Sequence, residues 1–84
     1  MTQEQALDAA FRREVAQLIA SHREANAVTV VALAKAVGVS RYSVIRWEDE
    51  SSERDISFRH WTMVAKMLGI PKKEWPVRFV TPGA

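Results

Sequence analysis

Three side chains with hydrogen-bonding chemistry, Arg41, Tyr42 and Arg46, lie close together in one short stretch of this chain. A guanidinium is a planar fork of N–H donors that can bind two acceptors at once. It therefore suits phosphate oxygens and the O6 and N7 atoms of guanine. Tyrosine adds an apolar ring and a hydroxyl. This chemistry predicts contact with a polyanion or with the edges of bases.

The helix expected to carry these side chains begins after Ser40 and runs to about Asp49. At about 100° per residue, Val44 and Trp47 share one side and are predicted to face inward. The outward set comprises Tyr42, Ile45, Arg46 and Asp49, with Arg41 on the flank.

An acidic run follows directly, and it raises a question, because carboxylates repel phosphates. Only Asp49 shares the outward side of the helix, where it can accept a hydrogen bond from a cytosine amino group or repel a phosphate. The other carboxylates are expected in a connecting loop, where they lower non-specific more than specific affinity. The run comprises Glu48, Asp49, Glu50, Glu53 and Asp55, interrupted by Arg54.

Apolar periodicity predicts an all-α domain of four helices, with all three prolines confined to the last quarter of the chain. The first helix carries a stripe of Leu7, Phe11, Val15, Leu18 and His22, and the fourth an inner stripe that includes Phe58 and Trp61. Thr29 and Ser40 are predicted N-caps, and Gly38 and Gly69 predicted helix stops. The helices are expected over residues 5–25, 30–37, 41–49 and 57–68.

The C-terminal tail, residues 71–84, is too apolar for a free end. Val77 and Phe79 alternate with Arg78, so a short β-strand is compatible with this segment. The strand can pair with its twin in a homodimer. Alternatively, Trp75 and Phe79 fold back onto their own domain. The N-terminal half of the first helix is a second candidate dimer surface.

Residues 30–49 meet the physical requirements of a helix–turn–helix unit. Two helices that cross closely need a small residue at the crossing, and their turn needs a residue that tolerates positive φ. The first helix and the turn also need apolar residues facing inward. These positions are filled by Leu33, Ala34, Val37, Gly38 and Val39, followed by Val44 and Trp47.

The stretch TVVALAKAVGVSRYSVIRWE, residues 29–48, resembles the helix–turn–helix of the phage Cro and repressor family, also called lambda-repressor-like or XRE. The resemblance extends over residues 15–75 and implies a compact domain of four to five helices. The run AVGVS…SVIRW is also similar to phage CII-type activators. Family members often carry Gln where this chain has Val30, and the connection from Glu48 to Ser57 is longer and more acidic here.

In this arrangement the N-terminal residues of the second helix of the unit enter the DNA major groove. Free backbone N–H groups at helix N-termini, hydroxyls and nearby cations suit phosphates. The residues predicted to read bases are Arg41, Tyr42, Ile45 and Arg46. Those predicted to contact phosphates are Thr29, Val30, Ser40, Ser43, Lys35, Arg23 and Arg54.

Other classes of function find little support in the sequence. There is no cysteine, and two distant histidines, His22 and His60, do not make a metal site. The absence of a glycine-rich phosphate loop and of a paired histidine motif argues against an enzyme. No apolar run approaches the ~20 residues that cross a bilayer, and the N-terminus does not resemble a signal peptide. We expect no cofactor, no small-molecule ligand, no membrane association and a cytoplasmic location.

The sequence therefore predicts one domain over residues 1–84 that binds double-stranded DNA as a transcriptional regulator of bacterial or phage type. A single unit of this size contacts little DNA, so we expect a homodimer. The alternative is a protein-interaction module, such as an antitoxin or adaptor, on the same scaffold. The acidic run and the apolar tail favour that alternative.

Overall fold

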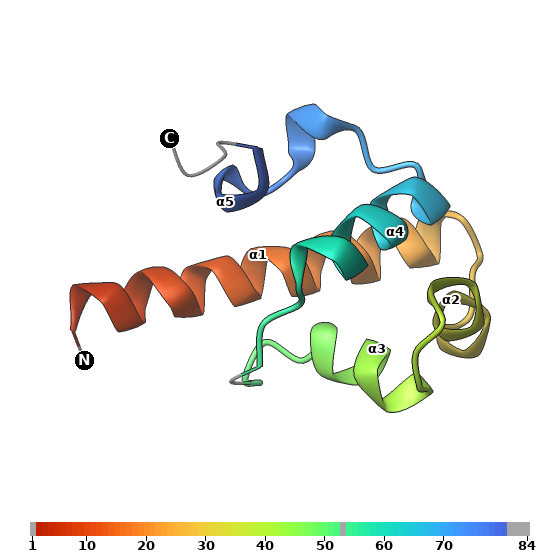
Figure 1. Ribbon diagram of the computed structural model, residues 1–84, viewed down its shortest axis with the longest axis horizontal. Helices are drawn as coiled ribbons and strands as arrows, with labels where there is room; N and C mark the ends of the chain where they lie inside the picture. The colour runs from red at the N-terminus through yellow and green to blue at the C-terminus, as the bar shows by residue number, and fades with distance from the viewer. Residues whose placement is uncertain (1, 53, 81–84) are drawn as a thin grey trace.

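Five α-helices and one 3-10 helix make up a computed structural model that describes residues 2–52 and 54–80 (Figure 1). Glu53 and residues 81–84, both part of segments interpreted above, lie outside the described residues. The helices are α1 (Gln3–Ala25), α2 (Val30–Val37), α3 (Arg41–Trp47), α4 (Phe58–Leu68), η1 (Lys72–Glu74) and α5 (Val77–Val80). The predicted all-α, helix-turn-helix-like domain is confirmed.

Side-chain caps define the starts of the helices. The hydroxyls of Thr29, Ser40 and Ser57 each accept a hydrogen bond from the backbone N–H three residues later. These bonds satisfy donors that the first helical turn leaves without a partner. A reciprocal capping box between Thr2 and Gln5 starts α1 two residues earlier than its apolar stripe predicted.

Glycines end α2 and α4 as predicted. Gly38 has φ +80° and Gly69 has φ +69°, both in the left-handed region where a side chain is strained. The N–H of Gly38 donates to the carbonyl of Ala34 at 2.9 Å, and so does the N–H of Val39 at 3.0 Å. The turn between α2 and α3 is therefore fixed by backbone bonds, and it sets the direction in which α3 leaves.

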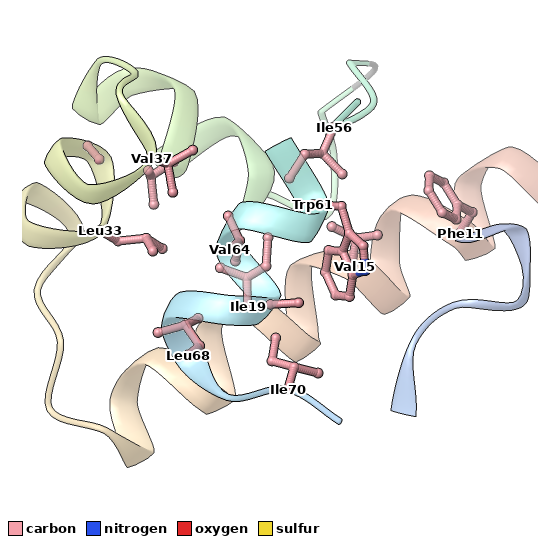
Figure 2. Close-up of a cluster of buried hydrophobic side chains, with 13 residues drawn as sticks. Phe11, Val15, Ile19, Leu33, Val37, Ile56, Trp61, Val64, Leu68 and Ile70 are labelled. Atoms are coloured by element: carbon pink, nitrogen blue, oxygen red, sulfur yellow. The ribbon is translucent and has the colours of Figure 1, made fainter. Parts of the chain in front are cut away.

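The core lies between the C-terminal half of α1, α2, α3 and α4, with Trp61 fully buried at its centre (Figure 2). α2 supplies Leu33 and Val37, while Val44 is the one fully buried side chain of α3. Ala34 is 3% exposed, as close packing at the α2–α3 crossing requires. Trp47 is only half-buried, so α3 is held mainly by Val44.

Two side chains predicted in the apolar stripes are exposed instead. Leu7 is 61% exposed because the N-terminal half of α1 projects beyond the other helices (Figure 1). Phe58 was predicted to be core, but it is 54% exposed at the start of α4. It is the first residue of that helix, and its ring lies beside that of Phe79 with centroids 5.6 Å apart.

The predicted C-terminal β-strand is wrong, because Val77–Val80 form the short helix α5. The ring of Phe79 packs edge-on against Phe11 at 5.1 Å and stacks on Trp61 at 5.5 Å. The indole N–H of Trp75 donates to the carbonyl of Ile70 at 2.9 Å. Helical geometry turns Phe79 inward while leaving Val77 74% exposed, so the aromatic residues follow the fold-back alternative.

We predict that Phe79→Ala lowers the free energy of unfolding by about 1–2 kcal/mol, since a half-buried ring loses packing against three aromatic neighbours. Val77→Ala is the matched control and is expected to change it by less than about 0.5 kcal/mol, because that side chain is exposed. Urea titration of the two variants measures both values. Equal stabilities would contradict the fold-back of the C-terminal segment.

Candidate nucleic-acid interface

Four side chains of α3 point away from the core and form what we call the α3 face: Arg41, Tyr42, Ile45 and Arg46. All four are exposed, and Tyr42 and Ile45 retain 57% and 50% of their accessible surface. About half of the surface of each of these two apolar side chains is therefore open to a partner. The arrangement places cations beside apolar surface, as contact with base edges requires.

Arg41 and Tyr42 lie against each other at the N-terminal end of the α3 face. The Arg41 Nη2 donates to the Tyr42 hydroxyl at 3.1 Å, and its guanidinium carbon lies 5.1 Å from the ring centroid. The bond uses one of the five N–H donors of the guanidinium. The others remain available for an acceptor beyond the protein surface.

Glu48, the first carboxylate of the acidic run, is bound within the protein. Arg23 of α1 donates two hydrogen bonds to its carboxylate, from Nε to Oε2 at 2.7 Å and from Nη2 to Oε1 at 2.9 Å. A third bond joins Arg23 to the carbonyl of Val28. The hydrogen bond to Glu48 raises the pKa of Arg23. The prediction that Arg23 contacts phosphate does not fit this geometry, since its guanidinium is occupied inside the chain.

Two further carboxylates of the run contact the same helix. Glu50 accepts a hydrogen bond from the Gln17 amide at 2.9 Å. Asp55 lies 3.3 Å from Arg12 and 3.7 Å from Arg78, and Arg78 also binds Asp8 at 2.7 Å. Side-chain hydrogen bonds and ion pairs therefore hold the segment after α3 against α1.

Asp49 does not lie on the helix at all, because α3 ends at Trp47 rather than at residue 49. Its carboxylate turns back and accepts hydrogen bonds from the Ser51 hydroxyl at 2.7 Å and the Ser51 backbone N–H at 2.9 Å. These bonds lower the pKa of Asp49. The predicted place of Asp49 on the outward side of α3 is wrong, because this local turn replaces the last helical turn.

We predict that Ser51→Ala raises the pKa of Asp49 toward the ordinary aspartate value, because the variant removes the hydroxyl that stabilises the charged form. In the native protein this lowered pKa gives a stabilisation that is present above the ordinary aspartate pKa and lost as pH falls through the lower folded value. A carboxyl-detected NMR titration of both proteins measures the change. An Asp49 pKa that is identical in the two proteins would contradict the turn geometry.

Four cations at or near the α3 face stand in contrast to the paired arginines. Within residues 2–52 and 54–80, ion pairs engage Arg12, Arg23 and Arg78, but none engages Lys35, Arg41, Arg46 or Arg54. All four of these side chains are exposed. Glu48, Glu50 and Asp55 of the acidic run thus have partners on α1 and α5, whereas Lys35, Arg41, Arg46 and Arg54 have no ion-pair partner among the described residues.

The remaining predicted phosphate contacts divide into exposed and packed groups. Thr29 and Ser40 cap α2 and α3 through their hydroxyl oxygens, so each hydroxyl keeps its hydrogen to donate. Ser43 is half-buried, with its Oγ 3.4 Å from that of Ser40. Val30 packs against the core, so only its backbone N–H at the start of α2 can serve a phosphate.

A hollow of about 220 Å³ lies beside the α3 face, and the sequence alone did not predict it. Arg46 and Arg54 contribute to its wall together with Asp55 and with His60, whose Nδ1 lies 3.2 Å from the Ser57 hydroxyl. The His60 ring also rests 5.5 Å from that of Trp47. Because the path of the segment after α3 decides which side chains meet here, spacing along the chain carried no signal for Ser57 or His60.

The second histidine has a separate partner, since the Nε2 of His22 lies 3.0 Å from a carboxylate oxygen of Glu74. Among the described residues, no group of three or more potential ligands is placed to hold a metal ion. None of the described helices has the length and apolar character needed to span a bilayer. Comparisons with protein-family models, with curated proteins and with solved structures found no match to this chain.

Proposed function

We propose that this protein is a sequence-specific double-stranded DNA-binding regulator of transcription that acts in the cytoplasm. One observation supports the proposal above the rest. The exposed cations on the α3 side have no ion-pair partner among the described residues, while Glu48, Glu50 and Asp55 beside them are bound to α1 and α5. The resemblance to the Cro and repressor family points to the same function.

In the proposed complex α3 enters the major groove with its N-terminal end deepest. Arg41 or Arg46 donates two hydrogen bonds to the O6 and N7 of a guanine. Ile45 rests on a thymine methyl, and Tyr42 combines apolar contact with a hydroxyl hydrogen bond. These contacts involve only side chains that already face outward, so little rearrangement of the protein is needed.

Phosphates on the two sides of the groove are bound by different groups. The start of α2, with the Thr29 hydroxyl and free backbone N–H groups, meets one strand, and Lys35 adds charge on the same helix. The hollow beside α3 meets the other strand, where Arg54 and His60 supply donors. These contacts position α3 in the groove without reading the sequence.

A pair of copies suits this proposal better than one. α3 has seven residues, which at about 1.5 Å each span about 10 Å, or roughly three base pairs. So short a site occurs too often in a genome to specify an operator. Two copies on half-sites about one helical turn apart double the information read.

The alternative function, a protein-interaction module, loses part of its support in the structure. Its two favouring features were the acidic run and the apolar tail. Glu48 and Asp55 are ion-paired within the chain, and Trp75 and Phe79 pack on their own domain. Glu48, Asp55, Trp75 and Phe79 therefore have partners within the chain, whereas Val77 of the tail remains 74% exposed.

We expect binding to duplex DNA to fall steeply with salt, because cations that neutralise phosphates release counterions. With about four phosphate contacts, a plot of log affinity against log salt should have a slope of roughly −3 to −4. Fluorescence anisotropy at salt concentrations from roughly 50 to roughly 200 mM measures this slope. A slope near zero, together with weak retention on heparin, would favour the interaction module.

A further inference from the structure

Two exposed apolar patches remain that the proposed DNA contact does not use. The first, the α1–α5 patch, consists of Leu7, Ala10, Glu14 and Val77, which line a groove of about 460 Å³ along the projecting half of α1 together with Phe11, Pro76 and Arg78. Leu7 is 61% and Val77 74% exposed. A leucine and a valine left this open on the same groove mark a surface suited to another protein surface.

The second, the α2–α4 patch, consists of Ala36, Met63, Lys66 and Met67, which line a groove of about 550 Å³ between α2 and α4. Met63 and Met67 are 37% and 43% exposed. Methionine side chains are flexible and adapt to the shape of an apolar partner. α2 and α4 contain no carboxylate of their own, so the charge that these two helices contribute is positive.

Both patches are apolar, and each also carries an exposed charge, of opposite sign on the two; Arg78 lines the first patch as well, but its guanidinium is bound to Asp8 and Asp55. Glu14 lies on the first and Lys66 on the second, both exposed, and neither belongs to an ion pair among residues 2–52 and 54–80. Glu4 is exposed on the same projecting part of α1, and Lys35 is exposed on α2. The surface that fits the α2–α4 patch, an apolar helix with acidic residues beside it, is therefore present on this chain itself.

We propose that the α1–α5 patch of one copy binds the α2–α4 patch of a second copy, head to tail. α2 and the projecting end of α1 lie at opposite ends of the long axis of the molecule, which measures 36 Å (Figure 1). A contact between two different surfaces at opposite ends leaves one of each surface free, so it adds further copies instead of closing a pair. No residue of the α3 face belongs to either patch, so the contact does not need DNA to form.

The experiment is sedimentation velocity without DNA across a wide range of protein concentration, for wild type, Glu14→Lys, Lys66→Glu and an equimolar mixture of the two variants. Wild type is expected to form dimers and then larger species as concentration rises. Each single variant is expected to lose about five-fold in association, because it faces like charges across the contact. The mixture is expected to regain it, since the lysine introduced in one variant then faces the glutamate introduced in the other.

Matched controls are Glu24→Lys and Lys73→Glu, which reverse the same charges at exposed positions outside both patches and should associate as wild type does. Circular dichroism of every variant verifies that the fold is retained. Wild type that stays monomeric throughout overturns the proposal, and so does a dimer that never grows larger. Loss in both single variants without recovery in the mixture also overturns it. Because DNA is absent, none of these outcomes depends on the proposed function.

Discussion

Replacing Arg41 and Arg46 together by alanine is expected to weaken binding to a cognate duplex by roughly 2–6 kcal/mol, the sum of about 1–3 kcal/mol for each arginine. Both guanidinium groups are exposed and outside the ion pairs of the described residues, so their removal costs the fold almost nothing. The urea midpoint of the double variant should therefore match that of wild type. Gel-shift titration against the cognate duplex and against a scrambled duplex measures the loss.

A lysine substitution separates recognition of bases by Arg46 from simple attraction between its charge and the DNA phosphates. Arg46→Lys keeps the charge but not the fork of donors, so it should lose discrimination between duplexes while retaining non-specific binding. Arg13→Ala combined with Arg59→Ala is the matched control, because it removes two exposed arginines from α1 and α4. Equal losses in the control and in the Arg41/Arg46 variant would show that overall charge, and not the α3 face, governs binding.

The second large expected effect is a loss of stability when the Arg23–Glu48 ion pair is broken. Glu48→Ala is expected to lower the free energy of unfolding by about 2–3 kcal/mol, because it leaves the Arg23 guanidinium without its bidentate partner. The Arg23 and Glu48 side chains are only 17% and 14% exposed, so water replaces the lost bonds poorly. The value stays below the range of roughly 3–5 kcal/mol for fully buried pairs, since some solvent reaches both groups.

Glu50→Ala serves as the matched control, since Glu50 is exposed and accepts a single hydrogen bond from Gln17. We expect a change within about 0.5 kcal/mol for this variant. The pair Arg23→Met with Glu48→Leu should recover most of the stability lost by Glu48→Ala, because an apolar pair needs no partner charge. Urea titrations in which Glu48→Ala and Glu50→Ala are equally stable would contradict a structural role for the Arg23–Glu48 pair.

The elements governed by local chemistry could be predicted from the sequence. Thr29 and Ser40 cap helices because their hydroxyls accept a hydrogen bond from the backbone N–H three residues later, and Gly38 and Gly69 end helices because glycine adopts positive φ freely. The α2–α3 unit followed from the same signals together with buried Ala34 and Val44. All of these depend on residues close together in the chain.

What the sequence could not predict depends on residues far apart. Glu48 meets Arg23 across 25 positions, and Asp55 meets Arg12 across 43. Residues 77–79 alternate between apolar and polar side chains, as in a β-strand. They are helical in the structure, and in this conformation Phe79 packs against Phe11 and Trp61. Tertiary contacts of this kind outweigh local preference, so the role of Arg23 emerges only from the folded chain, and for Phe79 the structure decides between the strand and the fold-back.

The acidic residues that follow the arginines of α3 thus have a structural explanation. Glu48, Glu50 and Asp55 fasten the segment after α3 to α1, and Asp49 caps its own turn. In doing so they fix the orientation of α3, whose only fully buried side chain is Val44. These carboxylates are compatible with the proposed DNA contact of α3, because Glu48, Glu50 and Asp55 are bound to other side chains of the protein.

Selection of bound duplexes from a random pool, carried out in parallel with wild type and with Arg46→Ala, tests most directly whether α3 reads DNA. We predict that wild type enriches a motif containing a specified guanine, and that Arg46→Ala enriches the same motif with the preference lost at one or two positions. No enriched motif for wild type, or an unchanged motif for the variant, would contradict the assignment of the α3 face.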